Sequence, residues 1–335
     1  MHRTVCLAVL GMAALLLLAG CTSKSNNNGG GPPPSTLALR AGVNDPKDTT
    51  VAVLSYLPSN ATVKVGATVK WTATGPEQHT ISFLPSGQAR PAPGTAAALA
   101  LQKPKPPTGS FDGTQTVSSG LGPTSQTPMT FSLTFSKAGT YTYFCSIHAA
   151  MQGTINVTSD TSKADTQVAA TQRGQQEENS YEAEGEAAKQ KLLSTPLQKK
   201  KNADGTTTWT VLMGTATAHT AVLAYQPAGP SIKAGDHVEF INDSGVPHTA
   251  SFAFGVPAPQ NPEGPNVKKA SGKSPLTLGT KGFFNSGWLL ANAPPGAGPP
   301  LALRSFTFIV PKAGSFNFFC ALHILSGMGG SIRAV

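Results

Sequence analysis

The sequence contains few charged, aromatic and cysteine residues. Of its 335 residues, 12% are charged and 7% are aromatic, and only four are cysteines. The hydrophobic share of 39% is too high for a chain that is disordered throughout. Collagen is excluded because the 35 glycines follow no three-residue period. Low charge with abundant Thr, Ser, Val, Gly and Pro favours short strands joined by turns over helical bundles.

Residues 1–20 predict a signal peptide, followed by a flexible tether at 21–40. The apolar run at 5–19 is long enough for a signal peptide but shorter than the ~20 residues that a membrane-spanning helix needs. It ends in Leu-Ala-Gly-Cys at Cys21, which resembles a bacterial lipobox and implies cleavage before Cys21 and lipid on its thiol. The alternative is an ordinary secretory signal in which Cys21 has no role. The tether is rich in Asn, Gly and Pro and cannot build a core.

The body of the chain consists of one unit that occurs twice. The block from Val53 to Phe83 aligns without a gap on the block from Val222 to Phe252, at a constant offset of 169 positions. A second block, from Phe131 to His148, aligns on Phe306 to His323 at an offset of 175. Two gapless blocks in the same order indicate a duplicated domain.

Both copies predict short antiparallel strands. Aromatic and apolar residues alternate within each block, so that Tyr141, Tyr143 and Cys145, for example, share one face of a strand. We therefore expect an all-β fold of two tandem Greek-key β-sandwiches, domain 1 at 41–159 and domain 2 at 206–335.

Residues 160–205 differ from both copies and predict a polar linker. This stretch holds eight of the 16 acidic residues of the chain. Residues 175–193 have a helix-forming composition but no convincing apolar stripe, so we expect the linker to be partly helical at best. The Pro- and Gly-rich stretches at 85–128 and 255–300 predict surface excursions.

The two copies place the same metal-ligating residue types at equivalent positions. The first set is His79, Cys145, His148 and Met151, and the second set is His248, Cys320, His323 and Met328. One thiolate, two imidazoles and a thioether suit copper, and two histidines and a cysteine with a weak axial methionine form the blue-copper arrangement. A single set leaves chance or a half-used zinc motif open, and either methionine could be core filler. The occurrence of the full set twice favours copper.

The stretches that carry the cysteines resemble those of the cupredoxins, small blue-copper proteins of the plastocyanin and amicyanin type. The pattern is Tyr-x-Tyr-x-Cys-x-x-His ending at His148, and Phe-x-Phe-x-Cys-x-x-His ending at His323. The resemblance implies a cupredoxin-like fold and one type 1 copper ion in each half. It also implies that these two histidines lie near an apolar surface through which electrons enter or leave. Phe144 and Phe319 stand where plastocyanin has a tyrosine associated with a second electron route.

We expect an extracytoplasmic electron carrier, anchored to the bacterial membrane through lipidated Cys21, with two type 1 copper ions and no enzymatic activity. Its expected partners are redox proteins such as cytochromes or oxidases. We expect it to bind neither nucleic acid nor a small-molecule substrate. Duplicated cupredoxin domains also build multicopper oxidases and nitrite reductases, but these need further histidines, and here only His219 and His237 are unassigned. A copper-delivery protein would use the same ligands and remains the alternative.

Overall fold

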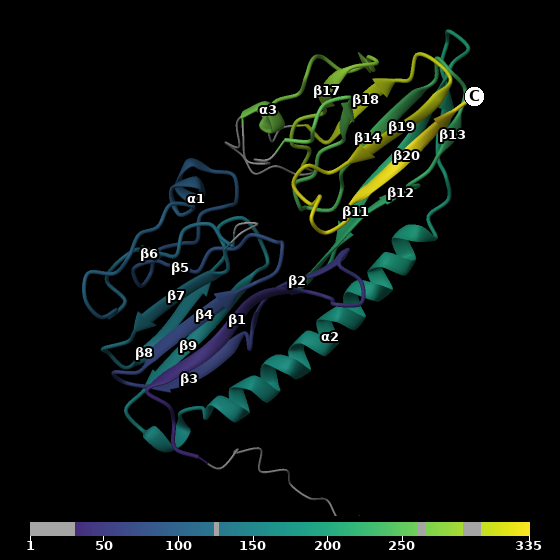
Figure 1. Cartoon of the computed structure of the whole chain (residues 1–335). Helices are drawn as coiled ribbons and strands as arrows, with labels where there is room; N and C mark the ends of the chain where they lie inside the picture. The colour runs from purple at the N-terminus through teal and green to yellow at the C-terminus, as the bar shows by residue number, and fades with distance from the viewer. Residues whose placement is uncertain (1–30, 124–126, 260–264, 291–302) are drawn as a thin grey trace, which may run out of the picture.

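The protein consists of two β-rich domains and one long helix that runs beside both (Figure 1). The computed structural model describes residues 31–123, 127–259, 265–290 and 303–335. The predicted signal peptide and Cys21 lie outside the described residues. Within those ranges, no helix has both the length and the apolar character that crossing a bilayer requires.

Domain 1 is a sandwich of two sheets. Its elements are β1 (Thr36–Asn44), β2 (Val51–Leu57), β3 (Asn60–Lys64), β4 (Thr68–Ala73), β5 (Ser82–Phe83), α1 (Ala96–Ala100), β6 (Val117–Ser118), β7 (Met129–Thr134), β8 (Gly139–Phe144) and β9 (Gln152–Thr158). One sheet has the order β3-β9-β8-β5-β6, and the other contains β2-β1-β4-β7. Most pairs are antiparallel, whereas β1–β4 and β3–β9 run parallel. Large aromatic side chains such as Trp71, Phe83 and Tyr143 are buried between the sheets.

Domain 2 repeats this plan. Its elements are β11 (Thr207–Ala216), β12 (Thr220–Gln226), β13 (Ser231–Ile232), β14 (His237–Ile241), β15 (Ser251–Phe254), α3 (Pro265–Lys268), β16 (Leu276–Thr277), β17 (Gly282–Asn285), β18 (Ser305–Ile309), β19 (Gly314–Phe319) and β20 (Gly329–Ala334). Its separate sheet has the order β13-β20-β19-β15-β17. Phe240, Phe252 and Phe318 occupy the core. Two sandwiches of similar construction agree with the fold predicted from the repeat.

The two domains share a sheet. Strand β12 pairs antiparallel with β2, with Thr220 opposite Val53, and this pairing joins both domains in one ten-stranded sheet. Strand β1 begins at Thr36, inside the range predicted as tether, and pairs with β2 and β4. A further strand, β10 (Lys199–Lys201), pairs with β11 at the end of the predicted linker.

Most of the predicted linker is the helix α2 (Gln167–Leu193), which is longer than its composition indicates. It lies against β1, β2, β11 and β12. A Cβ atom on Gly174 would lie 2.9 Å from the backbone of Pro58, and one on Gly185 would lie 2.5 Å from Val51 Cγ1. The helix therefore packs closely through glycines, which leave no apolar stripe in the sequence.

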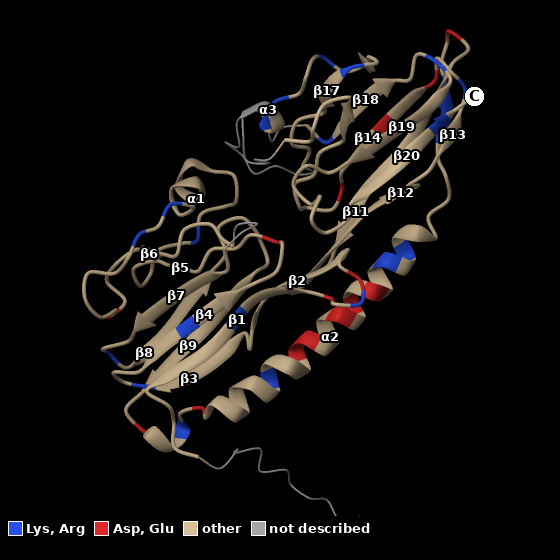
Figure 2. Cartoon of the chain, viewed as in Figure 1, with Lys and Arg blue, Asp and Glu red and all other residues tan. Residues whose placement is uncertain are grey.

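Ion pairs add to the contacts of α2, whose acidic residues gather near its middle (Figure 2). Oε2 of Glu178 lies 2.6 Å from Nη2 of Arg40 in domain 1, and Lys189 forms an ion pair with Asp48. Because these partners come from the strands and loops of domain 1, the polar face of the helix is part of the interface rather than a solvated linker surface.

Candidate metal centres

Domain 1 brings three of its predicted ligands together in a buried cluster. His79 lies between β4 and β5, Cys145 follows β8 directly, and His148 lies in the turn before β9. All three are buried, and their ligating atoms lie within 4.8 Å of one another. The sulfur of Cys145 lies 3.6 Å from Nδ1 of His148. Two loops that are distant in sequence thus converge at one end of the sandwich.

Domain 2 contains a second cluster of the same construction. Cys320 Sγ lies 3.3 Å from Nδ1 of His323 and 3.9 Å from Nδ1 of His248. The two Nδ1 atoms lie 3.1 Å apart. One sulfur and two imidazole nitrogens therefore face a common point, as a soft divalent or monovalent metal ion requires.

The protonation preferences of the clusters fit metal ligation. Burial raises the pKa of the Cys145 thiol, but the imidazoles of His148 and His79 outweigh it and hold this pKa well below its ordinary value. Cys320 behaves in the same way beside its own two histidines. Burial lowers the pKa of His79, which favours its neutral form. A thiolate and a neutral imidazole are the forms that bind a metal.

The threonine that follows the first histidine fixes each cluster. The Thr80 N–H donates to Cys145 Sγ over 3.4 Å, and its Oγ1 accepts from the Ser146 N–H at 2.8 Å. Thr249 makes the same two contacts with Cys320 Sγ and the Ala321 N–H, at the same distances. These threonines tie the two ligand-bearing loops together. The repeated His-Thr pair in the sequence was the signal that could have identified them.

A glycine lies against the first histidine of each cluster, and sequence reasoning missed both. Gly42 and Gly214 sit at bulges in β1 and β11, with φ of 67° and 74°. A Cβ on Gly42 would lie 1.9 Å from His79 Nε2, and one on Gly214 would lie 2.9 Å from Nε2 of His248. The bare glycine backbone therefore lies against the Nε2 edge of the imidazole, where a side chain would not fit.

The predicted axial ligands Met151 and Met328 are buried in the cores of their domains. The Cys145 N–H donates to the Met151 carbonyl at 3.1 Å, and the Cys320 N–H donates to the Met328 carbonyl at 3.0 Å. Both methionines thus close the loop that starts at the cysteine. Axial ligation by their sulfur atoms stays a prediction.

The loops of the two clusters are supported differently. Arg90, in the first Pro/Gly-rich excursion, donates hydrogen bonds of 2.6–2.7 Å to the carbonyls of Cys145, His148 and Ala149. In domain 2, His323 Nε2 instead lies 3.3 Å from a carboxylate oxygen of Glu77, which belongs to domain 1. The first loop is therefore held from within its domain and the second from the neighbouring domain.

The two unassigned histidines lie away from both clusters. The ring of His219 stacks on Tyr181 of α2 at 4.0 Å, and its Nδ1 lies 3.2 Å from Glu184. His237 lines a shallow recess with Glu239 and other polar residues of domain 2. Neither histidine joins a group of three or more metal-ligating side chains in the described part of the chain.

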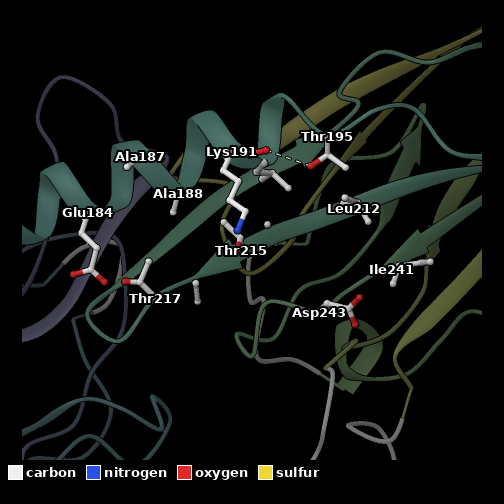
Figure 3. Close-up of a pocket in the computed structure, with 13 residues that line it drawn as sticks. Glu184, Ala187, Ala188, Lys191, Thr195, Leu212, Thr215, Thr217, Ile241 and Asp243 are labelled. Carbon is white, nitrogen blue, oxygen red and sulfur yellow. Dashed lines mark hydrogen bonds between the residues drawn. The ribbon is translucent and has the colours of Figure 1, made fainter.

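A surface cavity lies between α2 and the shared sheet, lined by residues such as Glu184, Lys191 and Asp243 (Figure 3). Leu212 and Ile241 contribute its apolar wall. No ligand of either cluster lines it, but Gly214, which lies against His248, does.

Comparison with known proteins links domain 1 to one family. Residues 47–158 match the family of copper binding proteins described as the plastocyanin/azurin family. Similar solved structures include a Cu(I) mutant of amicyanin, 20% identical, which covers 37% of this chain and 83% of its own, with a TM-score of 0.23. A mutant plastocyanin of fern is 25% identical and covers 36% of this chain and 99% of its own, also with a TM-score of 0.23. No curated protein matches the chain.

The family match covers the domain that holds the first cluster, and the second domain builds its cluster from the same residue types on equivalent elements. A buried thiolate with two imidazole nitrogens is also a donor set that suits copper. Residues 47–158 thus form a cupredoxin-like domain that matches a copper-binding family, and domain 2 repeats its fold and its cluster.

Proposed function

We propose that the protein is an extracytoplasmic electron carrier with one type 1 copper ion in each domain. The observation that carries the proposal is the duplicated cluster of one buried thiol and two imidazole nitrogens. Copper held by such a set exchanges one electron as it passes between Cu(I) and Cu(II). His79, Cys145 and His148 would hold the ion in domain 1, and His248, Cys320 and His323 would hold it in domain 2.

The surrounding residues support rapid electron exchange because they keep the ligands in place. Thr80 and Thr249 each join the two ligand-bearing loops through hydrogen bonds. Gly42 and Gly214 place bare backbone beside the first imidazole, where a side chain would collide with it. A ligand set that is held in one geometry needs little rearrangement when the charge of the ion changes.

An electron carrier is favoured over a copper enzyme by the number of metal-ligating groups. In the described ranges, the groups of three or more such side chains are the two clusters alone. A catalytic copper centre in a duplicated cupredoxin needs additional histidines, and His219 is instead engaged with α2. We therefore propose that the protein performs no bond chemistry of its own.

Membrane attachment and redox partners are part of the same proposal. The lipobox-like sequence that ends at Cys21 supports lipidation and retention at the outer face of the cytoplasmic membrane or at the cell surface. From there, the protein would exchange electrons with membrane-bound redox proteins such as cytochromes or oxidases. Metabolic labelling with a radioactive fatty acid, with Cys21→Ala as the control, tests the lipid anchor.

Copper loading tests the metal centres. The mature protein, reconstituted with Cu(II), is expected to bind two copper ions and to absorb strongly near about 600 nm through the thiolate-to-copper transition. Cys145→Ser and Cys320→Ser are each expected to remove one ion and its share of the absorption. A colourless protein after loading, or blue colour that survives both substitutions together, would contradict the proposal.

Stopped-flow mixing separates a carrier from a copper-delivery protein. The reduced two-copper protein is mixed with an oxidised c-type cytochrome in one experiment and with an apo copper acceptor in another. Rapid reoxidation by the cytochrome with copper retained supports the carrier. Rapid transfer of copper to the acceptor with slow reoxidation would instead assign the protein to delivery.

A further inference from the structure

The ligand-bearing loops of the two domains meet at the domain interface. Glu77 lies in the β4–β5 loop of domain 1, two residues before the ligand His79. Its side chain reaches the loop of domain 2 that carries His323. Thr49 Oγ1, also in domain 1, donates to the carbonyl of Ser326 in the same loop at 3.2 Å. The interface therefore places a ligand loop of one centre directly on a ligand loop of the other.

Glu77 is buried and uses both carboxylate oxygens in this contact. Its Oε2 lies 3.3 Å from Nε2 of His323, and its Oε1 accepts a hydrogen bond of 2.8 Å from Ser326 Oγ. Because Nδ1 of His323 faces the cluster, Nε2–H is left to donate to the carboxylate. A carboxylate on the outer nitrogen of a ligating histidine fixes its tautomer and its orientation.

Glu77 lies beside ligands of both clusters. Its buried carboxylate contacts Nε2 of His323 directly, and the residue stands two positions before His79 in the chain. A negative charge buried beside two metal centres interacts with both through a medium that screens it weakly.

The duplicated fold itself does not require this residue. The position of domain 2 that aligns with Glu77 is Val246, which is buried against the core of domain 2. A cupredoxin-like loop is therefore built with an apolar side chain at this place. The carboxylate is a feature of the interface between the domains.

We propose that Glu77 couples the two metal centres, and that electrons pass between the domains through its hydrogen bond to His323. The inference rests on the proposed function. With copper bound at both clusters, one electron would pass from the reduced ion of one domain to the oxidised ion of the other, so that oxidation and reduction would balance within the chain. The path leads from the imidazole of His323 across the hydrogen bond to Glu77 and along two peptide units to His79. No proton needs to leave the hydrogen bond.

Three variants of the full two-domain protein separate the charge from the hydrogen bond. Glu77→Gln removes the charge, but its amide oxygen can still accept from His323 and its amide nitrogen can donate to Ser326. Glu77→Val introduces the residue type that domain 2 has at the aligned position and removes the hydrogen bond as well. Glu182→Gln removes a partly buried carboxylate on α2 whose charged neighbours include no ligand, and serves as the control.

Redox titrations test the electrostatic part. The midpoint potential of each centre is measured alone, in Cys145→Ser and Cys320→Ser backgrounds. Glu77→Gln is expected to raise the potential of both centres, because removal of a negative charge favours Cu(I). The increase should be larger for the domain 2 centre, because Glu77 contacts its ligand His323 directly. The equilibrium distribution of one electron between the centres should change about tenfold, equivalent to ~59 mV. Equal potentials in Glu77→Gln and Glu182→Gln would overturn this part.

Internal electron transfer tests the path. One electron per protein is introduced by flash photoreduction, and its redistribution is followed by rapid-freeze EPR, with the signal of each centre taken from the single-site variants. Redistribution should be at least about tenfold slower in Glu77→Val than in Glu77→Gln or Glu182→Gln. Equal rates in Glu77→Val and wild type would overturn the path. If the single-site variants show no blue copper signal at all, the proposed function fails, a result that differs from blue centres without coupling.

Discussion

Replacement of Gly42 by alanine is expected to disable the domain 1 metal centre. The new Cβ would lie 1.9 Å from His79 Nε2, whereas ordinary contacts begin near 3.4 Å, so the imidazole must move by about 1.5 Å. The residue also has a φ of 67°, which costs an alanine about 1–2 kcal/mol. We expect the unfolding free energy of the metal-free protein to fall by about 3 kcal/mol, because the strain and the overpacking add.

The displaced imidazole should also weaken copper binding. Loss of support for a metal ligand costs about 10–100-fold in metal affinity, or about 1.4–2.7 kcal/mol. The assay is a Cu(II) titration of Gly42→Ala in a Cys320→Ser background, followed by visible absorption so that only domain 1 reports. Urea denaturation of the metal-free protein gives the stability change.

Gly66→Ala is the matched control, because Gly66 has a φ of 83° but no atom within 4 Å of the position that the new methyl group would take. It carries the backbone strain without the contact to His79, so it should lose about 1–2 kcal/mol of stability and bind copper normally. The reasoning is refuted if Gly42→Ala binds copper as tightly as Gly66→Ala with an unchanged spectrum. Gly214→Ala, tested in a Cys145→Ser background, should weaken the domain 2 centre in the same way.

Three further predictions concern the scaffold. Arg90→Met should destabilise the protein by about 2–3 kcal/mol in urea denaturation, because three backbone carbonyls of the ligand loop lose a charged donor; an unchanged midpoint would show that the loop holds its own conformation. His219→Ala should lose about 1 kcal/mol with its stack on Tyr181, and a double-mutant cycle with Tyr181→Ala should show coupling of that size, whereas additive effects would exclude it. Burial raises the pKa of Asp236, but hydrogen bonds from Trp209 and from backbone N–H groups outweigh it and lower this pKa, so its stabilisation is complete above about pH 4 and is lost as the pH falls. The stability difference between wild type and Asp236→Asn should therefore shrink in acid denaturation below about pH 4, and a constant difference would contradict this assignment.

The length and packing of the helix α2 could not be predicted from the sequence pattern. Its composition indicated a helix, but the absence of an apolar stripe indicated a linker that was partly helical at best. In the structure it spans Gln167–Leu193 and packs through Gly174 and Gly185. Small residues let a helix approach a sheet closely, yet they leave no hydrophobic period in the sequence. The packing of this helix therefore depended on the shape of the surface that it covers.

The fold class and the cupredoxin likeness were accessible from the sequence because both are written in local and repeated patterns. Apolar and polar residues alternate along each strand, and in a duplicated chain the same pattern occurs twice. The metal preference of a cysteine or histidine follows from its side chain, so the sequence alone indicated copper for Cys145, His148 and His79. For these features no distant contact had to be known.

Tertiary structure alone decided how the two halves act on each other. The antiparallel pairing of β12 with β2 and the approach of Glu77 to His323 join segments that are far apart in the sequence. Gly42 likewise gains its meaning only when the fold presses its backbone against His79. A single carboxylate or glycine has no periodicity, and its role depends on which distant atoms the packed chain brings within a few ångströms.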